Sequence, residues 1–485
     1  MRGPYFIGID IGTQGARIVL LSIEGEMIAS FEETFPLDEA SREEQSPQVW
    51  WDACCGSLKK LSVEIKGKID PSEIKGIAVT STSGTVIPLD KKHEPLYPAI
   101  MYSDKRSVVE AMWCQETAAK FCPNGYTGFN TSSGLSKMVW YVKKFPQQSN
   151  KISQWCHAAD FITGKLSGVW GVTDFTNALK SGYDVQNEEW PGYLFDQFPL
   201  KKEWMSKVLP SGEAIGHLDS KVAQMLGLSS TTQVAVGITD GCASQIASGA
   251  ISPGDWNTTI GTTMVVKGVT EKAIIDPLGR LYSHRHPMGY WMPGGASNTG
   301  ADWVTQEFGG RLDQCNEKAR SLIPTRHLSY PLRQKGERFP FISADAEGFE
   351  PAGLSLEERY VANMEGVAFL ERYSFELIRH LSGEPINAVY TAGGASNSEV
   401  WLKIRSNVLN LPIYKMKYVS GAVGAAVLAA SKIHFNSLEA AGKALIQTEK
   451  VIYPDRYLYE RYEVNYRLFI DLMINKGYIK DRFDA

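Results

Sequence analysis

Residues 6–21 read Phe-Ile-Gly-Ile-Asp-Ile-Gly-Thr-Gln-Gly-Ala-Arg-Ile-Val-Leu-Leu, and residues 256–267 read Trp-Asn-Thr-Thr-Ile-Gly-Thr-Thr-Met-Val-Val-Lys. Each stretch has an apolar run, an Ile-Gly-Thr turn and a second apolar run, which is typical of two strands joined by a tight turn. The recurrence of this pattern about 250 residues along the chain indicates two related halves. Each half would present one phosphate-sized loop, and we expect the chemistry in the space between the loops.

The length and composition favour a two-domain globular protein. At 485 residues the chain exceeds what one hydrophobic core usually supports, and we place the domains at 1–248 and 249–485. Hydrophobic residues make up 43% and charged residues 21% of the chain, which is ordinary for a globular protein. The formal net charge of -4 gives no reason to expect a nucleic acid or an anionic membrane as partner.

Targeting and cysteine patterns favour a cytoplasmic protein. The chain enters an apolar run at Tyr5 without a preceding basic stretch and apolar signal region. It contains no run of about 18 apolar residues, so we expect no membrane span. The seven cysteines show no paired C-x-x-C spacing, which argues against structural zinc and fits a reducing cytoplasm.

Apolar patterning predicts strands and helices along the whole chain. In the first half it predicts a meander of three strands at 5–10, 17–23 and 27–35. It also predicts a helix at 49–65 and a continuous apolar strand at 74–80. In the second half it predicts a strand, a small-residue helix, a strand pair, a turn leading into a helix and a long helix, at 234–238, 242–250, 284–295, 294–298 and 362–381. Another small-residue helix, at 421–430, is expected to pack closely against its neighbours.

The first Ile-Gly-Thr turn combines glycines with a carboxylate. Gly12 and Gly15 allow close approach to the backbone, so that main-chain N–H groups can point at phosphate oxygens. Asp10 ends a buried strand, where it is costly to leave unpaired and suited to hold a divalent cation. The alternative is a simple hairpin in which Asp10 only caps the turn. The recurrence at Gly261 favours phosphate binding, although the spacing is neither that of a P-loop nor that of a dinucleotide fold.

Asp240 follows the apolar run 234–238 and precedes Gly241. A carboxylate at the carboxyl end of a strand faces the crevice where open α/β sheets bind ligands. There it can accept the proton of a hydroxyl that attacks the γ-phosphate of a nucleotide. The alternative is the N-cap of the following helix, a common use of aspartate, and the two roles are compatible.

Polar and glycine-rich turns end other predicted strands. The turn Gly393-Gly394-Ala-Ser-Asn397 follows an apolar strand, and its glycines would let a flat adenine or ribose lie against bare backbone. Taken alone, this turn is equally typical of an ordinary strand-to-helix connection. Ser83 and Asp104 hold comparable positions in the first half and suit a polyhydroxylated substrate, although surface turns carry such residues too.

In this order the motifs resemble those of the FGGY carbohydrate kinases, which belong to the actin, hexokinase and Hsp70-type ATPase superfamily. The resemblance covers essentially the whole chain and rests on the two turns, on Asp240 and on the segments 137–140, 364–369, 393–397 and 454–466. It implies two actin-like (ribonuclease H-like) α/β domains with a cleft between them. It also implies an enzyme that transfers the γ-phosphate of ATP to a sugar hydroxyl.

The resemblance implies a role for each candidate residue. Asp240 would be the general base, and Asp10 would organise Mg²⁺ near the phosphates of ATP. Ser83 and Asp104, together with Asp240, would contact the sugar. The nucleotide would be bound by the two Ile-Gly-Thr turns and the glycine-rich turn, through Gly12, Thr13, Gln14, Gly261, Thr262, Gly394 and Asn397.

Several segments are most similar to the pentulose kinases that phosphorylate D-ribulose, namely 82–85, 177–183, 282–284, 289–298 and 336–340. Xylulokinases usually carry Met-His-Gly where this chain has Thr82-Ser83-Gly84, which counts against D-xylulose. We therefore expect D-ribulose to be converted to D-ribulose 5-phosphate. The alternative is a xylulokinase or another polyol or ketose kinase of the family.

Two other functions share the superfamily core. An actin- or Hsp70-like ATPase scaffold would hydrolyse ATP without sugar and usually carry an appended peptide-binding region, for which the kinase pattern leaves no room. A degenerate sugar-binding regulator is disfavoured because Asp10 and Asp240 are both present. As partners we expect the small sugar substrate, no nucleic acid and no membrane, in a monomer or homodimer.

Overall fold

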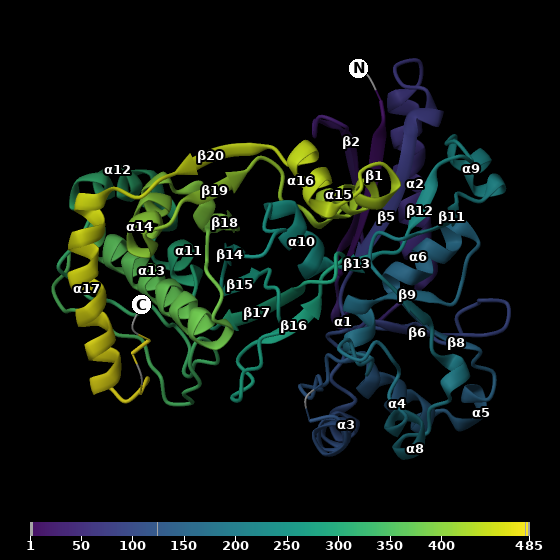
Figure 1. Ribbon diagram of the computed structural model, residues 1–485, viewed down its shortest axis with the longest axis horizontal. Helices are drawn as coiled ribbons and strands as arrows, with labels where there is room; N and C mark the ends of the chain where they lie inside the picture. Colours follow the sequence, from purple (N-terminus) through teal and green to yellow (C-terminus); the bar gives the residue numbers. More distant parts are fainter. Residues whose placement is uncertain (1–2, 124, 481, 484–485) are drawn as a thin grey trace. The chain divides into compact units, whose positions relative to one another are not determined.

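The computed structural model describes residues 3–123, 125–480 and 482–483, and it divides into two compact units (Figure 1). Unit 1 comprises the residues up to 247 together with 284–289 and 418–447. Unit 2 comprises 248–283, 290–417 and the residues from 448 onward. The segment 418–447 thus lies in unit 1, although the sequence-based division assigns it to the second domain.

Unit 1 contains both strands and helices. Its strands are β1 (Tyr5–Gly12), β2 (Gly15–Ser22), β3 (Met27–Thr34), β4 (Glu44–Gln45), β5 (Ile74–Ser81), β6 (Val86–Leu89), β7 (Ala99–Ile100), β8 (Gln154–His157), β9 (Val172–Asp174), β10 (Lys207–Leu209), β11 (Ala214–His217), β12 (Gln233–Ala235) and β13 (Ile238–Thr239). Its helices are α1 (Glu39–Glu43), α2 (Pro47–Ile65), α3 (Val108–Phe121), α4 (Gly134–Lys144), α5 (Pro146–Ser149), α6 (Ala158–Ser167), α7 (Phe175–Leu179), α8 (Tyr193–Gln197), α9 (Ser220–Leu226), α10 (Asp240–Ser248), α15 (Gly421–Ile433) and α16 (Leu438–Leu445). The main sheet has the order β11-β12-β5-β1-β2-β3, and β13 also pairs with β5.

The two faces of this sheet are covered by different kinds of side chain, because residues alternate between faces along each strand. Ile7 and Ile77 belong to a core shared with α2, α6 and α9. The opposite face carries small residues, and Ala78 packs there against α15. A Cβ on Gly8 would collide with the carbonyl group of Ala422 in α15, so the helix and the strand are in backbone contact. Figure 1 shows this close approach of the yellow α15 to the purple β1, and the predicted close packing of the helix is confirmed.

Unit 2 is built on a second mixed sheet. Its strands are β14 (Asp255–Ile260), β15 (Met264–Gly268), β16 (Tyr282–Arg285), β17 (Trp291–Ser297), β18 (Ala388–Ala392), β19 (Ile413–Met416) and β20 (Thr448–Ile452), in the order β16-β17-β15-β14-β18-β19-β20. Its helices are α11 (Asp302–Phe308), α12 (Leu312–Leu322), α13 (Leu356–Ser382), α14 (Glu399–Leu409) and α17 (Arg456–Asn475), and the 3₁₀ turn η4 (Gly394–Asn397) follows β18. The long α13 begins with a capping box between Ser355 and Glu358 and ends at Gly383, whose φ is 68°.

Two sequence-based predictions of secondary structure are wrong in detail. The predicted strand 234–238 is interrupted, because Gly237 lies against the backbone of Val79 and separates β12 from β13. The predicted turn at 294–298 is instead the end of β17, in which Ala296 pairs with Val265 of β15. Gly295 serves side-chain packing there, since a Cβ would lie 2.5 Å from the ring of Phe339. Within the described ranges, no helix combines the length and apolar character that a membrane span requires.

Candidate active site

Asp10 and Asp240 lie at the same edge of the unit 1 sheet. β1 and β13 both run parallel to β5, and Asp10 and Ile238 are both in register with Thr80. Asp240 directly follows β13 and begins α10. Burial and the negative charge of Asp240 raise the pKa of Asp10 to about 7. The two carboxylates predicted from the sequence are therefore brought together.

The carboxylate of Asp10 rests against the N-terminus of α15. Gly421 is the first residue of this helix, and a Cβ there would lie 2.7 Å from Oδ2 of Asp10. Ser420 caps the helix by accepting a hydrogen bond from the N–H of Val423. Helix N-termini favour a nearby anion. Gly421 is absent from the sequence-based site, and the run of small residues that begins at Ser420 is the signal that marks it.

The same helix holds α10 in place. Gly424 of α15 lies so close to Ala243 of α10 that a Cβ on the glycine would collide with the backbone. At the start of α10, Oδ1 of Asp240 accepts a hydrogen bond from the N–H of Gly241, 2.6 Å away. Glycines in α15 thus allow one helix to contact the elements that carry both carboxylates.

The turn after β5 holds Ser83 in a defined position. The hydroxyls of Thr82 and Thr85 share a hydrogen bond of 2.9 Å, and Gly84 has a φ of 85°. A Cβ on Gly84 would collide with the carbonyl oxygen of Ser132, so the turn rests on a neighbouring loop. Among the described residues, Oγ of Ser83 is buried and makes no hydrogen bond. A buried hydroxyl of this kind suits a hydrogen bond to a substrate hydroxyl.

Asp104 is only 2% exposed and is anchored by Arg106. Nη2 of Arg106 lies 2.6 Å from Oδ2 of Asp104, and the guanidinium carbon lies 4.6 Å from the ring centre of Trp140. Lys137 is fully buried and donates a hydrogen bond to the carbonyl of Thr131. Burial lowers the pKa of Lys137 to about 7, and the negative charge of Asp104 opposes this shift. A contact between Asp104 and a sugar stays a prediction.

The first Ile-Gly-Thr turn is held in place by hydrogen bonds to its carbonyl groups. The carbonyl of Thr13 accepts a hydrogen bond from Nε2 of Gln45 at 2.9 Å, and that of Gln14 accepts one from the N–H of Phe35 at 2.7 Å. Gly12 lies in β1 and is paired with the first residue of β2. A Cβ on Gly12 would meet no protein atom closer than 3.6 Å, which is an ordinary contact. The protein's own packing therefore does not require a glycine at this position.

Two of the glycines predicted from the sequence to bind a nucleotide, Gly261 and Gly394 in unit 2, show the same feature. A Cβ on Gly261 or on Gly394 would have no other atom within 4 Å. Gly393 differs, because its φ is 84° and a Cβ would lie 2.5 Å from the carbonyl oxygen of Ile260. Thr262 and Asn397 are exposed beside these glycines. Only Gly393 is demanded by the fold, so the other glycines are available for a ligand to approach the backbone.

The buried carboxylate of Glu337 stabilises the segment next to the second Ile-Gly-Thr turn. Glu337 accepts hydrogen bonds from two backbone N–H groups and three hydroxyls, namely Asn298 N–H (2.6 Å), Arg338 N–H (3.0 Å), Ser297 Oγ (2.9 Å), Thr299 Oγ1 (2.9 Å) and Tyr330 OH (3.0 Å). The segment that Glu337 holds continues to Ala301, whose N–H donates to the carbonyl of Gly261 at 2.7 Å. The sequence links Glu337 to the family only through the segment 336–340 and does not reveal this role.

The carboxylate of Asp10 fits a magnesium ion that arrives with a nucleotide. Carboxylate oxygens are the ligands that Mg²⁺ prefers, and it commonly takes one or two of them together with substrate phosphates. Among the described residues, no group of three or more His, Cys, Asp or Glu side chains forms a complete metal site. A cation near Asp10 would also relieve the repulsion that raises its pKa.

Comparison with known proteins identifies the family. The profile of the FGGY family of carbohydrate kinases matches residues 5–247 with its N-terminal domain and residues 250–433 with its C-terminal domain. The chain therefore belongs to the FGGY family and is a carbohydrate kinase, a phosphotransferase with an alcohol group as acceptor. The predicted α/β fold with two actin-like domains is confirmed.

Xylulose kinases and gluconokinases are among the proteins similar to this chain. The xylulose kinase of Bacillus subtilis is 26% identical over 96% of this chain and 96% of its own length. The gluconokinase of the same organism is 24% identical over 87% and 86% of the two chains. The crystal structure of a xylulose kinase from Rhodospirillum rubrum has a TM-score of 0.83 and 24% identity, over 97% and 98% of the chains. These relatives do not support the more specific resemblance to D-ribulose kinases.

Proposed function

We propose that this carbohydrate kinase transfers the γ-phosphate of ATP to a ketopentose, with D-xylulose as the first substrate to test. The similarity to a xylulose kinase over 96% of both chains supports the choice of sugar. The observation that carries the proposed chemistry is the pair of carboxylates, Asp10 and Asp240, at one edge of the unit 1 sheet. Burial and the negative charge of Asp240 raise the pKa of Asp10 to about 7, and a carboxylate with such a raised pKa is typical of a functional site.

In the proposed reaction Asp240 accepts the proton of the sugar hydroxyl while the oxygen of that hydroxyl attacks the γ-phosphorus of ATP. The bond between the γ-phosphorus and the bridging oxygen breaks, and ADP leaves. Ser83 and Asp104 orient the sugar, and the backbone of the two Ile-Gly-Thr turns donates hydrogen bonds to the phosphates. When bound with the nucleotide beside Asp10, Mg²⁺ would neutralise phosphate charge. Because phosphoryl transfer needs little covalent help from the protein, most of the rate enhancement comes from positioning and electrostatics.

D-ribulose is the second candidate substrate. The turn Thr82-Ser83-Gly84 stands where xylulokinases usually carry Met-His-Gly. A buried serine hydroxyl offers one small donor and acceptor where an imidazole would offer a larger ring. A change of this kind in a polar pocket alters which sugar hydroxyls find a partner, and unpaired hydroxyls are strongly rejected.

The test is ADP release with MgATP and a panel of D- and L-xylulose, D- and L-ribulose, ribitol, glycerol and D-gluconate. We expect the highest kcat/KM with D-xylulose, whereas the highest value with D-ribulose would replace it by the second candidate. A preference for D-gluconate would overturn the assignment to ketopentoses. ADP release that does not depend on any of these acceptors would overturn the proposed acceptor class as a whole.

A further inference from the structure

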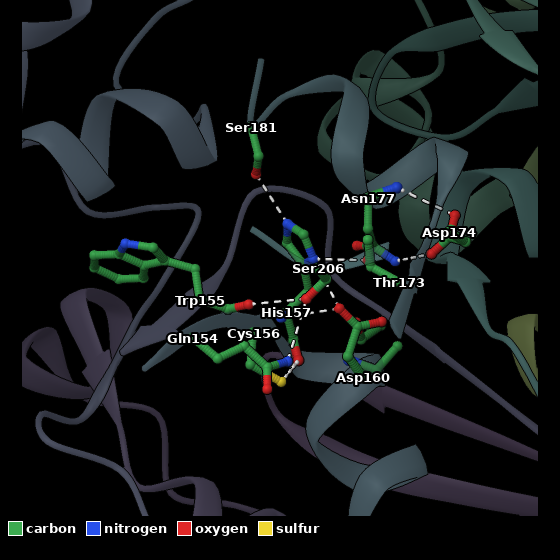
Figure 2. A network of polar contacts seen from close by, with 12 residues as sticks. Gln154, Trp155, Cys156, His157, Asp160, Thr173, Asp174, Asn177, Ser181 and Ser206 are labelled. Carbon is green, nitrogen blue, oxygen red and sulfur yellow. Dashed lines mark hydrogen bonds and ion pairs between the residues drawn. The ribbon is translucent and has the colours of Figure 1, made fainter. Parts of the chain in front are cut away.

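A buried network of polar side chains lies next to the strand that leads to Asp240, and Figure 2 shows most of it. Asp174 ends β9 and caps α7. Its Oδ1 accepts hydrogen bonds from the N–H and the hydroxyl of Thr176, at 2.7 Å and 2.5 Å, and its Oδ2 accepts one from Nδ2 of Asn177 at 2.6 Å. All three side chains are fully buried. The carboxylate therefore fixes the orientation of its neighbours.

The network reaches Asp240 through one hydroxyl. The hydroxyl of Thr176 has a single hydrogen, which it donates to Asp174, so its oxygen is left as an acceptor. That oxygen accepts a hydrogen bond from the N–H of Thr239 at 2.9 Å. Thr239 directly precedes Asp240 and ends the short strand β13. Thr239, which precedes Asp240, is thus held by its pairing with β5 in the sheet and by the hydrogen bond from its N–H group to Thr176.

A second branch of the network fixes β9 just before Asp174 (Figure 2). Nδ1 of His157 lies 2.8 Å from Oδ2 of Asp160 and 3.0 Å from Oγ1 of Thr173. On the other side of the ring, Nε2 lies 2.8 Å from Oγ of Ser181. The two branches therefore meet at neighbouring residues of one strand.

Burying the Asp174 carboxylate in this network lowers the stability of the fold. Burial and the negative charge of Asp160 raise the pKa of Asp174, which shows that the carboxylate is held in an unfavourable environment. An apolar residue at position 174 would avoid that cost, but it could not orient the hydroxyl of Thr176. Small displacements of a catalytic group reduce rates strongly, so a rigid support next to a general base has a clear use.

We infer that Thr176, oriented by Asp174, is a positioning residue that holds the Asp240 carboxylate in its reactive place. The inference rests on the proposed role of Asp240 as the general base. It predicts that loss of the Thr176 hydroxyl slows the chemical step and leaves the binding of both substrates intact.

The experiment compares Thr176→Val with Thr176→Ser, which keeps the hydroxyl. The matched control is Thr232→Val, which removes a fully buried hydroxyl that donates to the carbonyl of Ile74 at 2.8 Å, at the opposite end of β5. For each variant, kcat and both KM values are measured with MgATP and with D-xylulose, or with D-ribulose if that sugar is the better substrate. The kcat values are normalised to the number of ADP-binding sites found by calorimetry, and thermal unfolding is recorded in parallel.

We expect kcat of Thr176→Val to fall on the order of 10- to 100-fold, with both KM values within about twofold of wild type. Thr176→Ser should recover most of the loss, and Thr232→Val should keep wild-type kcat. Equal normalised kcat in the two valine variants would overturn the inference, because Thr176 would then act only in folding. Asp240→Asn is measured alongside, since wild-type turnover in that variant would refute the proposed base itself, whatever Thr176→Val does.

Discussion

The two Ile-Gly-Thr hairpins have the same topology and different chemistry. In unit 1, β1 lies between antiparallel β2 and parallel β5, and in unit 2, β14 lies between antiparallel β15 and parallel β18. The registers differ by one residue near the turn, since Ile11 pairs with Ala16 in the first hairpin and Ile260 pairs with Met264 in the second. Counted from the Ile-Gly-Thr sequence, Thr259 occupies the position of Asp10, and the glycine-rich turn after β18 corresponds to the hydroxyl-rich turn after β5.

The difference between the hairpins lies in what each presents to a ligand. At the end of the first hairpin stands a carboxylate whose pKa is raised to about 7, and a turn with a buried serine hydroxyl follows β5. In the second hairpin, the hydroxyl of Thr259 donates to Oδ1 of Asn257 at 3.0 Å, and bare glycine backbone follows β18. Under the proposed function, both turns donate hydrogen bonds to the phosphates. The first copy of the scaffold also serves the metal and the sugar, and the second copy also serves the rest of the nucleotide.

Replacement of Asp10 by Asn tests the first hairpin and should have the largest effect of the substitutions considered at the two hairpins. We expect turnover to fall about 10²- to 10³-fold, because the metal and phosphate lose a charged partner. The same substitution should increase the stability of the folded protein at neutral and alkaline pH. The folded protein keeps a proton on Asp10 between about pH 4 and 7, where the unfolded chain has lost it, so wild-type stability falls as the pH rises through this window.

Asn carries no charge, so Asp10→Asn should exceed wild-type stability at pH 8, by on the order of 2 to 4 kcal/mol, and match it near pH 4. Thermal unfolding at the two pH values measures this. Asp255→Asn is the matched control, because burial raises the pKa of Asp255 to about 6 at the start of the second hairpin. That variant should keep turnover, and a catalytic loss equal to that of Asp10→Asn would contradict the contrast between the hairpins.

The glycine pair after β18 separates a ligand requirement from a folding requirement. Gly394→Ala adds a Cβ in open space, so we expect KM for ATP to rise about 10-fold, with the sugar KM unchanged and stability equal or up to about 1 kcal/mol higher. Gly393→Ala should instead lose roughly 1 to 3 kcal/mol of stability, because its φ of 84° and the nearby Ile260 carbonyl oppose a side chain. Steady-state kinetics and denaturant unfolding distinguish the two, and identical behaviour would remove the argument for a nucleotide at Gly394.

Replacement of Glu337, which stabilises the segment next to the second Ile-Gly-Thr turn, should give the smallest kinetic effect. In Glu337→Gln, one carboxylate oxygen becomes an NH₂ group that cannot accept its former hydrogen bonds. We expect a loss of about 1 to 3 kcal/mol in stability and a rise of a few-fold in KM for ATP. Glu365→Gln is the control, since this buried glutamate accepts hydrogen bonds from the hydroxyls of Thr325 and Tyr462 and not from the segment next to the second Ile-Gly-Thr turn. An equal rise in its KM for ATP would show that Glu337 has no special connection to the turn.

Local patterns were sufficient to predict much of the fold. Apolar runs predicted both hairpins and the buried strand β5, and the helix predicted at 49–65 corresponds to α2, which begins at Pro47. Small residues at 421–430 predicted the tight packing of α15. Each of these signals lies within the segment that it describes. The prediction of a turn at 294–298 failed because Gly295 makes room for the distant ring of Phe339, which no local pattern reveals.

The candidate site was predictable in part for the same reason. Asp10 and Asp240 could be chosen from the sequence because each stands at the end of a recognisable strand, but no pattern indicated that both strands pair with β5 in one sheet. Gly421 contacts Asp10 across more than four-fifths of the chain, and Thr176 reaches Thr239 through a single hydroxyl. Such contacts depend on how distant segments pack, which the sequence pattern alone does not specify.

The most direct test of the proposed mechanism, in which Asp240 is the general base, is the turnover of Asp240→Asn. It is measured as ADP release with MgATP and the preferred sugar of the panel. The substitution keeps the shape of the side chain and removes its ability to accept the proton of the hydroxyl. We predict a fall in kcat of about 10²- to 10⁴-fold, with the affinity for ADP unchanged. A variant that turns over within about threefold of wild type would contradict the assignment of Asp240 as the general base.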